Sequence, residues 1–212
     1  MSRPYVLLSA AVSLDGALDD GSPDRLILSG PADLDEVDAL RADSDAILVG
    51  AGTVRADNPR LLVASAARRA DRERRGLPAT PLRVVLSGSG VLDPAARVFT
   101  GGPAPLVYTR RPDAALPATV VPLTAPADVL ADLYARGVRR LLVEGGAVVL
   151  HDLLARELAD ELRLAVAPVF VPDPGAVRFR GAGPRARLTE VRRVEELAVL
   201  RYAFESSCAS LS

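Results

Sequence analysis

Short apolar runs of strand length alternate with helical patterns along most of this chain. The runs that we expect to form strands are residues 5–13, 46–49, 82–86, 106–109, 119–121, 140–143 and 161–169. Between them we expect helices that begin at Pro31 and at Gly146, and one that spans Ala127–Arg136. This alternation is typical of an α/β domain whose parallel sheet is covered by helices on both faces.

The last quarter of the chain has a different pattern. Residues 188–194 and 197–204 alternate between apolar and polar side chains, and only Glu195 and Glu196 separate them. Two such runs with so short a connection indicate an antiparallel hairpin. We therefore predict a mixed, mostly parallel sheet with an antiparallel C-terminal edge. Because the chain has no internal repeat and no long linker, residues 1–212 are predicted to form a single domain.

The composition excludes several classes of function. All 26 basic residues are arginine, which excludes lysine Schiff-base chemistry and a P-loop lysine. The single histidine, His151, and the single cysteine, Cys208, cannot build a metal centre of imidazole and thiolate ligands, and no internal disulfide can form. The net charge of −1 gives no electrostatic reason to expect a nucleic-acid partner.

Membrane insertion and export are not expected either. No stretch approaches the roughly 20 apolar residues that span a bilayer, and the apolar run Tyr5–Leu14 lacks a small-residue cleavage pattern. We interpret this run as a buried first strand and expect a cytoplasmic protein. Residues 65–79 contain five arginines around a single leucine, so we expect an exposed loop or a short solvated helix there.

Glycine-rich segments follow three of the expected strands. They are Val49-Gly50-Ala51-Gly52-Thr53, Leu86-Ser87-Gly88-Ser89-Gly90 and Val143-Glu144-Gly145-Gly146-Ala147. Each alone is more simply a tight turn, but the carboxyl ends of strands are where α/β sheets bind ligands. Together the segments indicate a long anionic ligand across several strand ends. A Rossmann fingerprint is excluded, because Gly50-Ala51-Gly52 lacks the third glycine.

Five ordered motifs resemble those of a known family. They are Pro4-Tyr5-Val6, Ala11-x-Ser13-Leu14-Asp15-Gly16, Asp45-Ala46-Ile47-Leu48-Val49-Gly50-x-Gly52-Thr53-Val54-x-x-Asp57-Asn58-Pro59-x-Leu61, Pro81-x-Arg83-Val84-Val85-Leu86 and Val143-Glu144-Gly145-Gly146. This set resembles the riboflavin-biosynthesis pyrimidine reductases, and it covers nearly the whole chain. The resemblance implies a dihydrofolate-reductase-like fold of three layers, α/β/α. It also implies a stand-alone reductase, because the H-x-E and P-C-x-x-C motifs of a companion deaminase are absent.

The resemblance implies that NADPH reduces the ribosylamino side chain of a phosphorylated aminopyrimidine to a ribitylamino chain. The nicotinamide is then expected over Ala10 and Ala11, beneath the turn of Ser13, Asp15 and Gly16. The diphosphate and its sugars are expected at Gly50, Gly52 and Thr53, and at Gly145, Gly146 and Ala147. The adenosine end is expected at Ser87, Gly88 and Ser89, with Arg55 or Arg110 near the 2′-phosphate.

On the substrate side, the resemblance implies catalytic roles for Asp57 and Glu144, whose carboxylates could accept N–H groups or relay a proton. Ser29, Asp33, Arg60 and Leu61 are the expected substrate-binding residues. Four of these residues also have a structural alternative. Asp57 could form a turn before Asn58-Pro59, and Glu144 could simply face solvent at a strand end. Ser29 could cap the following helix, and Asp33 could be a first-turn acid that favours the helix dipole.

Two departures from the family pattern leave the substrate open. Family members commonly carry a lysine where this chain has Ser9 and an arginine where it has Ala64. Arg60 or Arg68 could replace that arginine as a phosphate ligand. Asp33 resembles the aspartate of the dihydrofolate reductase helix that contacts a pteridine, so dihydrofolate or a related pterin is the alternative substrate. A nucleotide-binding module without catalysis is the other alternative, and a homodimer built on the C-terminal hairpin is expected.

Overall fold

The structure is a computed structural model that describes residues 2–19, 27–111, 113–179 and 183–205, so Cys208 lies outside the described residues. The chain packs into two compact units, each built from two separate stretches of sequence. The first unit contains Met1–Tyr5 and Asp38–Gly146, and the second contains Val6–Val37 and Ala147–Ser212. The single domain over residues 1–212 stays a prediction.

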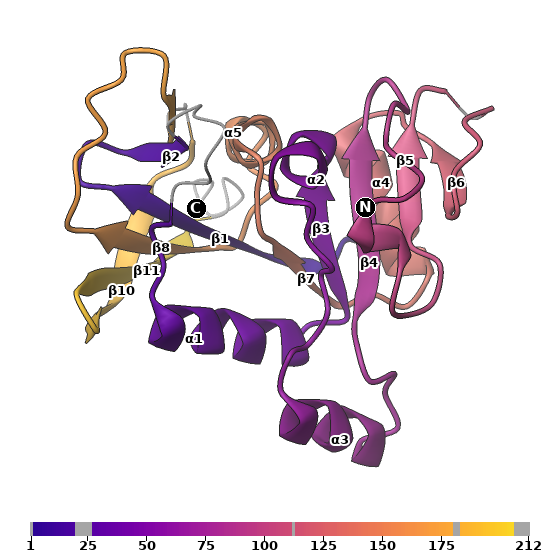
Figure 1. Ribbon diagram of the computed structural model, residues 1–212, viewed down its shortest axis with the longest axis horizontal. Helices are drawn as coiled ribbons and strands as arrows, with labels where there is room; N and C mark the ends of the chain where they lie inside the picture. Colours follow the sequence, from indigo (N-terminus) through magenta and orange to yellow (C-terminus); the bar gives the residue numbers. More distant parts are fainter. Residues whose placement is uncertain (1, 20–26, 112, 180–182, 206–212) are drawn as a thin grey trace, which may run out of the picture. The chain divides into compact units, whose positions relative to one another are not determined.

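The first unit has a parallel sheet. Its strands are β3 (Ala46–Gly50), β4 (Leu82–Ser87), β5 (Leu106–Thr109), β6 (Thr119–Pro122) and β7 (Arg140–Val143). They lie in the order β7-β3-β4-β5-β6, and each neighbouring pair is parallel. Figure 1 shows β3, β4 and β5 pointing the same way. The predicted parallel centre of the sheet is confirmed, and each predicted strand of this unit matches to within one residue at either end.

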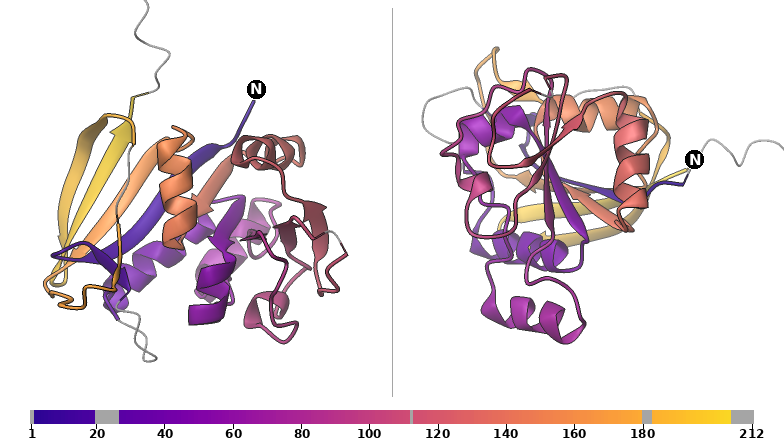
Figure 2. Two further views of the ribbon diagram at one scale, coloured as in Figure 1. Left: turned by 90° about the horizontal axis from the view of Figure 1, so that it is seen from above. Right: turned by 90° about the vertical axis from the view of Figure 1, so that its right-hand side faces the viewer.

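Helices cover both faces of this sheet. Helix α2 (Ala51–Asp57) and helix α4 (Pro126–Ala135) lie on opposite sides of it in Figures 1 and 2. On the α2 side, Val54 packs in one apolar cluster with alternate residues of the strands, among them Ile47, Val49 and Val85. The helix α3 (Ala66–Arg74) and a 3₁₀ turn, η1 (Arg97–Phe99), complete the unit.

The second unit carries the antiparallel part of the sheet. Its strands β1 (Tyr5–Ser13, from Val6 on), β8 (Glu161–Ala167), β10 (Ala186–Val194) and β11 (Leu197–Phe204) lie in the order β10-β11-β8-β1. Strands β1 and β8 are parallel, whereas β11 is antiparallel to both β8 and β10. The hairpin β10-β11 is the long yellow ribbon of Figure 2. The predicted antiparallel C-terminal edge is therefore confirmed.

Two further helices position side chains that matter below. Helix α5 (Ala147–Ala155) buries Val149, Leu150, Leu153 and Leu154 at helical spacing. Helix α1 (Pro31–Ala42) begins in the second unit and ends in the first. Its buried positions include two carboxylates, Asp33 and Asp38, where an apolar stripe is the usual pattern.

Three features differ from the sequence predictions. The segment after Gly50 is not only a turn, because α2 begins at Ala51. Strands β2 (Ala17–Asp19) and β9 (Val177–Arg178) form a small antiparallel pair that the sequence pattern did not indicate. The arginine-rich segment does form the short helix α3, but Arg72 within it is 2% exposed. The expectation of a fully solvated segment was wrong there, because the guanidinium binds backbone carbonyls inside the unit.

Candidate active site

In the first unit, the three glycine-rich segments lie side by side. The backbone N–H of Gly50 donates to the carbonyl of Gly145 at 3.1 Å, and the N–H of Glu144 donates to the carbonyl of Leu48 at 3.1 Å. Gly50 is also the partner of Leu86 in the parallel register of β3 and β4. The carboxyl ends of β7, β3 and β4 thus form one continuous edge, which is where a parallel sheet offers space to ligands.

Thr53 ties two of these segments together. Its Oγ1 accepts a hydrogen bond of 2.8 Å from the N–H of Gly146, so the hydroxyl proton remains available to donate. A Cβ on Gly146 would lie 3.2 Å from that oxygen, and Gly145 has a φ of +135°, a conformation that side-chain-bearing residues avoid. By contrast, nothing lies within 4 Å of a Cβ built on Gly52, so the backbone is open there.

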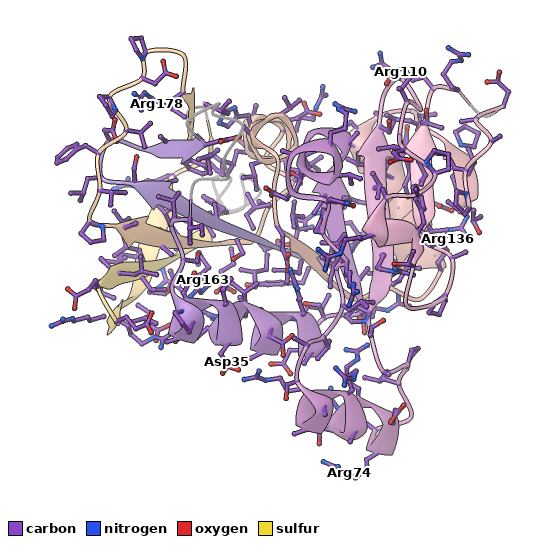
Figure 3. The ribbon with its side chains drawn as sticks, in the orientation of Figure 1. Asp35, Arg74, Arg110, Arg136, Arg163 and Arg178 are labelled. Carbon is purple, nitrogen blue, oxygen red and sulfur yellow. The ribbon has the colours of Figure 1, made fainter. Side chains whose placement is uncertain are left out.

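The end of β4 carries a buried hydroxyl without a partner. Ser87 is 1% exposed, and its Oγ has no hydrogen-bond partner among the described residues. An unsatisfied buried hydroxyl costs about 1–3 kcal/mol, so a polar ligand atom at this position would be favourable. Gly88 and Ser89 follow on the surface. Arg110, which follows β5, is exposed and has no ion-pair or hydrogen-bond partner in the described part of the chain (Figure 3).

Glu144 is held by an arginine that sequence reasoning missed. The Nε of Arg41 donates to Oε1 and its Nη2 donates to Oε2, each at 2.6 Å, so the pair is bidentate. The Glu144 side chain is 10% exposed and that of Arg41 is 23% exposed. Burial by itself would lower the pKa of Arg41, but the hydrogen bonds and charge of Glu144 raise it above its ordinary value. Glu144 is therefore fixed in orientation at the end of β7 rather than being a solvated strand end.

The segment from Asp57 to Leu61 is a constrained turn. Asp57 ends α2 and is half-buried. Asn58 has a φ of 44°, and its Oδ1 accepts a hydrogen bond of 2.7 Å from the N–H of Arg97. Leu61 has a φ of 54° and is 2% exposed, so its side chain anchors the turn in the apolar core. Arg60 lies between these two positions on the surface.

The two arginines considered for a substrate phosphate differ in their surroundings. Arg68 donates to Asp38 at 3.0 Å, and the same carboxylate accepts from the N–H groups of Ala64 and Ser65. Arg68 is therefore partly neutralised, and Ala64 contributes its backbone to that contact. Arg60 has no hydrogen-bond or ion-pair partner within the described ranges. Of the two, Arg60 is the better phosphate ligand.

In the second unit, Ser13, Asp15 and Gly16 form a braced turn after β1. Ser13 Oγ donates to Asp15 Oδ1 at 2.6 Å and accepts from the N–H of Ala17 at 2.8 Å. Asp15 also accepts from the N–H of Val171 and from Arg178, each at 3.0 Å. The hydrogen bonds from Ser13 and Val171 lower the pKa of Asp15. Gly16, with a φ of +81°, completes the turn.

The remaining predicted residues of this unit differ in accessibility. Ala10 and Ala11 are half-buried on β1, and so are Ser29 and Ala147, the first residue of α5. Ser9, at the place of the family lysine, is buried on the same strand. Small side chains on β1 are compatible with the predicted nicotinamide floor.

Asp33 already has a partner inside the protein. Arg163 on β8 is 1% exposed and donates to Asp33 Oδ1 at 2.6 Å and to Glu36 Oε2 at 2.8 Å. Figure 3 shows Arg163 pointing toward α1. Glu36 in turn binds Arg192 of β10 at 2.8 Å. Burial would raise the pKa of Glu36, but its hydrogen bonds with Arg192 and Arg163 lower it. The buried carboxylate of Asp33 is thus explained by the charge of Arg163.

The fold and the geometry of the strand ends point to a class of protein. The structure is similar to that of dihydrofolate reductase from Enterococcus faecalis, with a TM-score of 0.57 at 15% identity over 95% of this chain and 97% of that one. The fold is therefore dihydrofolate-reductase-like. Residues 4–200 match the RibD C-terminal domain, and the chain belongs to this family. The family resemblance inferred from the motifs is confirmed.

Two relatives are more similar in sequence. The 2,5-diamino-6-ribosylamino-4(3H)-pyrimidinone 5′-phosphate reductase of Archaeoglobus fulgidus is 39% identical over 208 residues, which are 92% of this chain and 95% of the relative. A pyrimidine reductase-like protein from Corynebacterium diphtheriae has a TM-score of 0.80 at 25% identity, over 96% of this chain and 93% of that one. The chain is thus an oxidoreductase of the pyrimidine reductase type.

Neither a metal centre nor a membrane-spanning helix is present among the residues that the structure describes. Within the described ranges, no three His, Cys, Asp or Glu side chains are grouped so that they could hold a metal ion. Among the helices that the structure describes, none combines the length and the apolar character that crossing a lipid bilayer requires.

Proposed function

We propose that this protein reduces 2,5-diamino-6-ribosylamino-4(3H)-pyrimidinone 5′-phosphate to its ribitylamino form in riboflavin biosynthesis, with NADPH as the reductant. The observation that carries the proposal is the continuous edge formed by the ends of β7, β3 and β4, with Glu144 fixed upon it. The similarity over almost the full length of the Archaeoglobus fulgidus reductase supports the same substrate.

The residues of the first unit fit the phosphate-rich part of NADPH. The open backbone at Gly52 and the free hydroxyl proton of Thr53 support a role for these residues in holding the diphosphate and its sugars, with Gly50 directly before them at the end of β3. The unpartnered Ser87 Oγ supports a role in binding the adenosine end. Arg110 is the proposed ligand of the 2′-phosphate, because its guanidinium is exposed and has no partner among the described residues. When bound, the cofactor supplies the hydride.

The substrate is held by charges of both signs in this proposal. Each oxygen of Glu144 accepts one hydrogen bond from Arg41, which leaves acceptor capacity for the ring N–H and amino groups of the pyrimidine. Arg60, displayed by the constrained turn, binds the 5′-phosphate in place of the arginine that Ala64 has replaced. Asp57 at the end of α2 moves the proton that reduction of the sugar–nitrogen linkage requires.

The nicotinamide is proposed to lie over Ala10 and Ala11 of β1, beside the Ser13–Gly16 turn. The hydrogen bonds of Asp15 to Ser13, Val171 and Arg178 support a fixed conformation for that turn. A preformed turn lowers the entropy lost when the ring is oriented, and holding the donor and acceptor carbons in line is a main contribution of the protein to hydride transfer. We find no observation that favours the pterin alternative, since the carboxylate of Asp33 binds Arg163.

Steady-state oxidation of NADPH by the purified chain tests the proposal. We expect turnover with the ribosylamino-pyrimidinone phosphate and none with dihydrofolate. Arg60→Ala should raise KM about 10- to 100-fold with little change in kcat, because it removes a charge-assisted contact with the phosphate. Arg97→Ala, on an exposed arginine beside the same turn, is the matched control and should leave KM unchanged. NADPH binding without turnover of any aminopyrimidine would instead identify a non-catalytic nucleotide-binding module.

The cofactor preference has its own test. Arg110→Ala should reduce the preference for NADPH over NADH about tenfold or more, because only NADPH carries the phosphate that this arginine binds. Arg111→Ala is the control, since Arg111 is also exposed but has Asp113 at 3.5 Å. An unchanged preference in Arg110→Ala would place the 2′-phosphate elsewhere.

We also propose that the protein is a homodimer that pairs through the hairpin. β10 is the last strand in its sheet order and exposes Leu188 and Val191 to 50% and 60%. An exposed edge strand with apolar side chains is a common site of association. Val191→Asp should convert the dimer to a monomer in sedimentation velocity, whereas a monomeric wild type would exclude the proposal. The cytoplasmic location stays a prediction from the sequence.

A further inference from the structure

A cavity of about 290 Å³ lies in the first unit at the opposite end of the strands from the candidate active site. Its walls come from the residues that lead into the parallel strands, namely Asp45 before β3, Pro81 before β4, Ala104 before β5 and Val138 before β7. The glycine-rich segments follow the same strands, so the two sites are separated by the length of the sheet. In Figure 3, Arg110 marks the end to which β4 and β5 point, and Arg136, which lines the cavity, lies toward the other end.

Two buried guanidinium groups line this cavity. Arg72 and Arg83 are each 2% exposed. Arg72 donates to the carbonyls of Pro78, Ala42 and Ser44 at 2.6–2.8 Å, and Arg83 donates to those of Val98, Thr100 and Pro103. Neither has a carboxylate within ion-pair distance in the described part of the chain. Burial lowers the pKa of both arginines.

The plainest interpretation is that each arginine only ties loops together. Carbonyl dipoles satisfy hydrogen bonds, but they do not neutralise a full charge, and buried charges in proteins are normally paired. Arg163 provides the comparison within this chain, because it is just as buried and binds two carboxylates. The cavity therefore contains more positive charge than its own walls balance.

The other charges that face the cavity do not remove this excess. Asp45 lines the cavity and attracts Arg72 more strongly than Asp43 does, but neither carboxylate is within ion-pair distance of it. The Oδ2 of Asp45 accepts from the N–H groups of Arg139 and Arg140. No carboxylate of the described residues contributes to the pKa of Arg83, which burial alone lowers. Arg136 is paired with Asp132 at 2.8 Å. Among the described residues, Arg72 is therefore balanced only at longer range and Arg83 not at all, so an excess of positive charge remains.

Two N–H groups without an acceptor and an apolar wall can contact a ligand in this cavity. Arg72 Nη2 and Arg83 Nε have no acceptor among the residues that the structure describes, and Leu77, Pro78, Pro81 and Pro103 supply apolar surface beside them. We propose that this cavity binds a small organic oxyanion, a carboxylate or a phosphate ester whose apolar body lies against the proline-rich wall. The inference concerns a site separate from the reductase chemistry and does not rest on the proposed function.

Ligand-observed NMR titration of the full chain tests the inference with simple probes. Benzoate and phenyl phosphate should bind saturably in the millimolar range, and whichever binds more tightly identifies the preferred oxyanion. Inorganic phosphate should bind about tenfold more weakly than phenyl phosphate, because it cannot bury apolar area against the wall. Benzyl alcohol, which has the body without the charge, should not bind.

A pair of variants at one exposed position locates the site without disturbing the buried arginines. Ala104→Asp places a carboxylate at the cavity and should weaken benzoate and phenyl phosphate binding at least tenfold. Ala104→Asn, which has the same shape without the charge, should leave binding within about twofold. Both variants should have the circular dichroism spectrum and the Tm of the wild type, which shows that they are folded. Arg60→Ala should not affect probe binding, because that residue belongs to the other site.

Several results would overturn the inference. They are the absence of saturable binding of both organic anions, equal binding by Ala104→Asp and the wild type, and loss of binding in Arg60→Ala. Equal affinities of inorganic and phenyl phosphate would also overturn it. A chain that lacks reductase activity but retains Ala104-dependent anion binding would contradict the proposed function alone.

Discussion

The bidentate pair of Arg41 and Glu144 allows a quantitative test of how the active-site carboxylate is positioned. Both of its hydrogen bonds are 2.6 Å long, and Glu144 is 10% exposed. Arg41→Met keeps most of the aliphatic stem but leaves the carboxylate without its counter-charge. Removing one partner of a buried ion pair costs about 3–5 kcal/mol, because a desolvated charge remains. Since the Arg41 side chain is still 23% exposed, we expect the lower end, about 3 kcal/mol.

Thermal unfolding and chemical denaturation measure this loss. For a chain of this length, about 3 kcal/mol corresponds to a decrease in Tm of roughly 6–12 °C. The double variant Arg41→Met/Glu144→Gln carries no charge at either position, so it should recover part of the loss. A coupling free energy of about 2 kcal/mol or more is expected from the double-mutant cycle.

Kinetics separate a positioning role for Arg41 from a purely structural one. Glu144→Gln should lower kcat/KM about 10- to 100-fold, because the substrate loses a charged hydrogen-bond acceptor. If Arg41 acts only through Glu144, the double variant should have the same kcat/KM as Glu144→Gln alone. Strictly additive losses in both stability and log kcat/KM would refute the reasoning, because independent residues give no coupling.

Three further predictions concern the second unit and the end of β4. Asp33→Asn leaves Arg163 with a single carboxylate and should lower the free energy of unfolding by about 3 kcal/mol in urea, whereas an unchanged midpoint would mean that the buried pair does not stabilise the fold. Burial raises the pKa of Glu36, but its two arginine partners lower it below the ordinary value of 4.5. The ionised Glu36 carboxylate therefore stabilises the folded wild type above pH 4.5, and this contribution is lost as the pH falls through the lower pKa of the folded state. Glu36→Gln has no such group, so its free energy of unfolding should depend less on pH between about pH 5 and pH 3. Gly90→Ala combines a φ of +69° with contacts at 3.0 Å and should destabilise by about 1–3 kcal/mol, while Gly88→Ala, with nothing within 4 Å, should change Tm little. Equal Tm values for these two variants would contradict the strain assigned to Gly90.

The strands and the glycine-rich edge could be predicted because their signals are local. A buried parallel strand is a short apolar run, and Ala46–Gly50 or Leu82–Ser87 needs no distant partner to be identified. The glycines that follow these strands mark their carboxyl ends, so parallel pairing alone places them together. The family motifs, which occur in the same order along the chain, supported the assignment of these segments to one site. The small pair β2-β9 was missed because three- and two-residue strands have no periodicity to detect.

The charged interior could not be predicted in the same way. Helix α1 buries Asp33 and Asp38 on the face where apolar residues are expected, and the partner of Asp33 is 130 positions away in the sequence. Its acidic first turn was interpreted as favourable to the helix dipole, which is the reading that local sequence supports. Similarly, nothing near Arg41 indicates that Glu144 is its partner. Side chains of this kind are recognised only when the fold brings distant segments together.

The absence of lysine acquires a structural meaning once these contacts are known. The three largest fully buried side chains are those of Arg72, Arg83 and Arg163. Each of them donates at least two hydrogen bonds. A planar guanidinium can bind separate acceptors from one buried position, whereas a lysine ammonium is a compact, strongly hydrated charge that is expensive to bury. The acceptors, however, divide the three arginines into two kinds. Arg163 meets carboxylates and is neutralised within the chain, whereas Arg72 and Arg83 meet only carbonyls and keep their charge. The same residue type therefore forms a closed ion pair between β8 and α1, and it lines the cavity for which we propose an anionic ligand before the parallel strands.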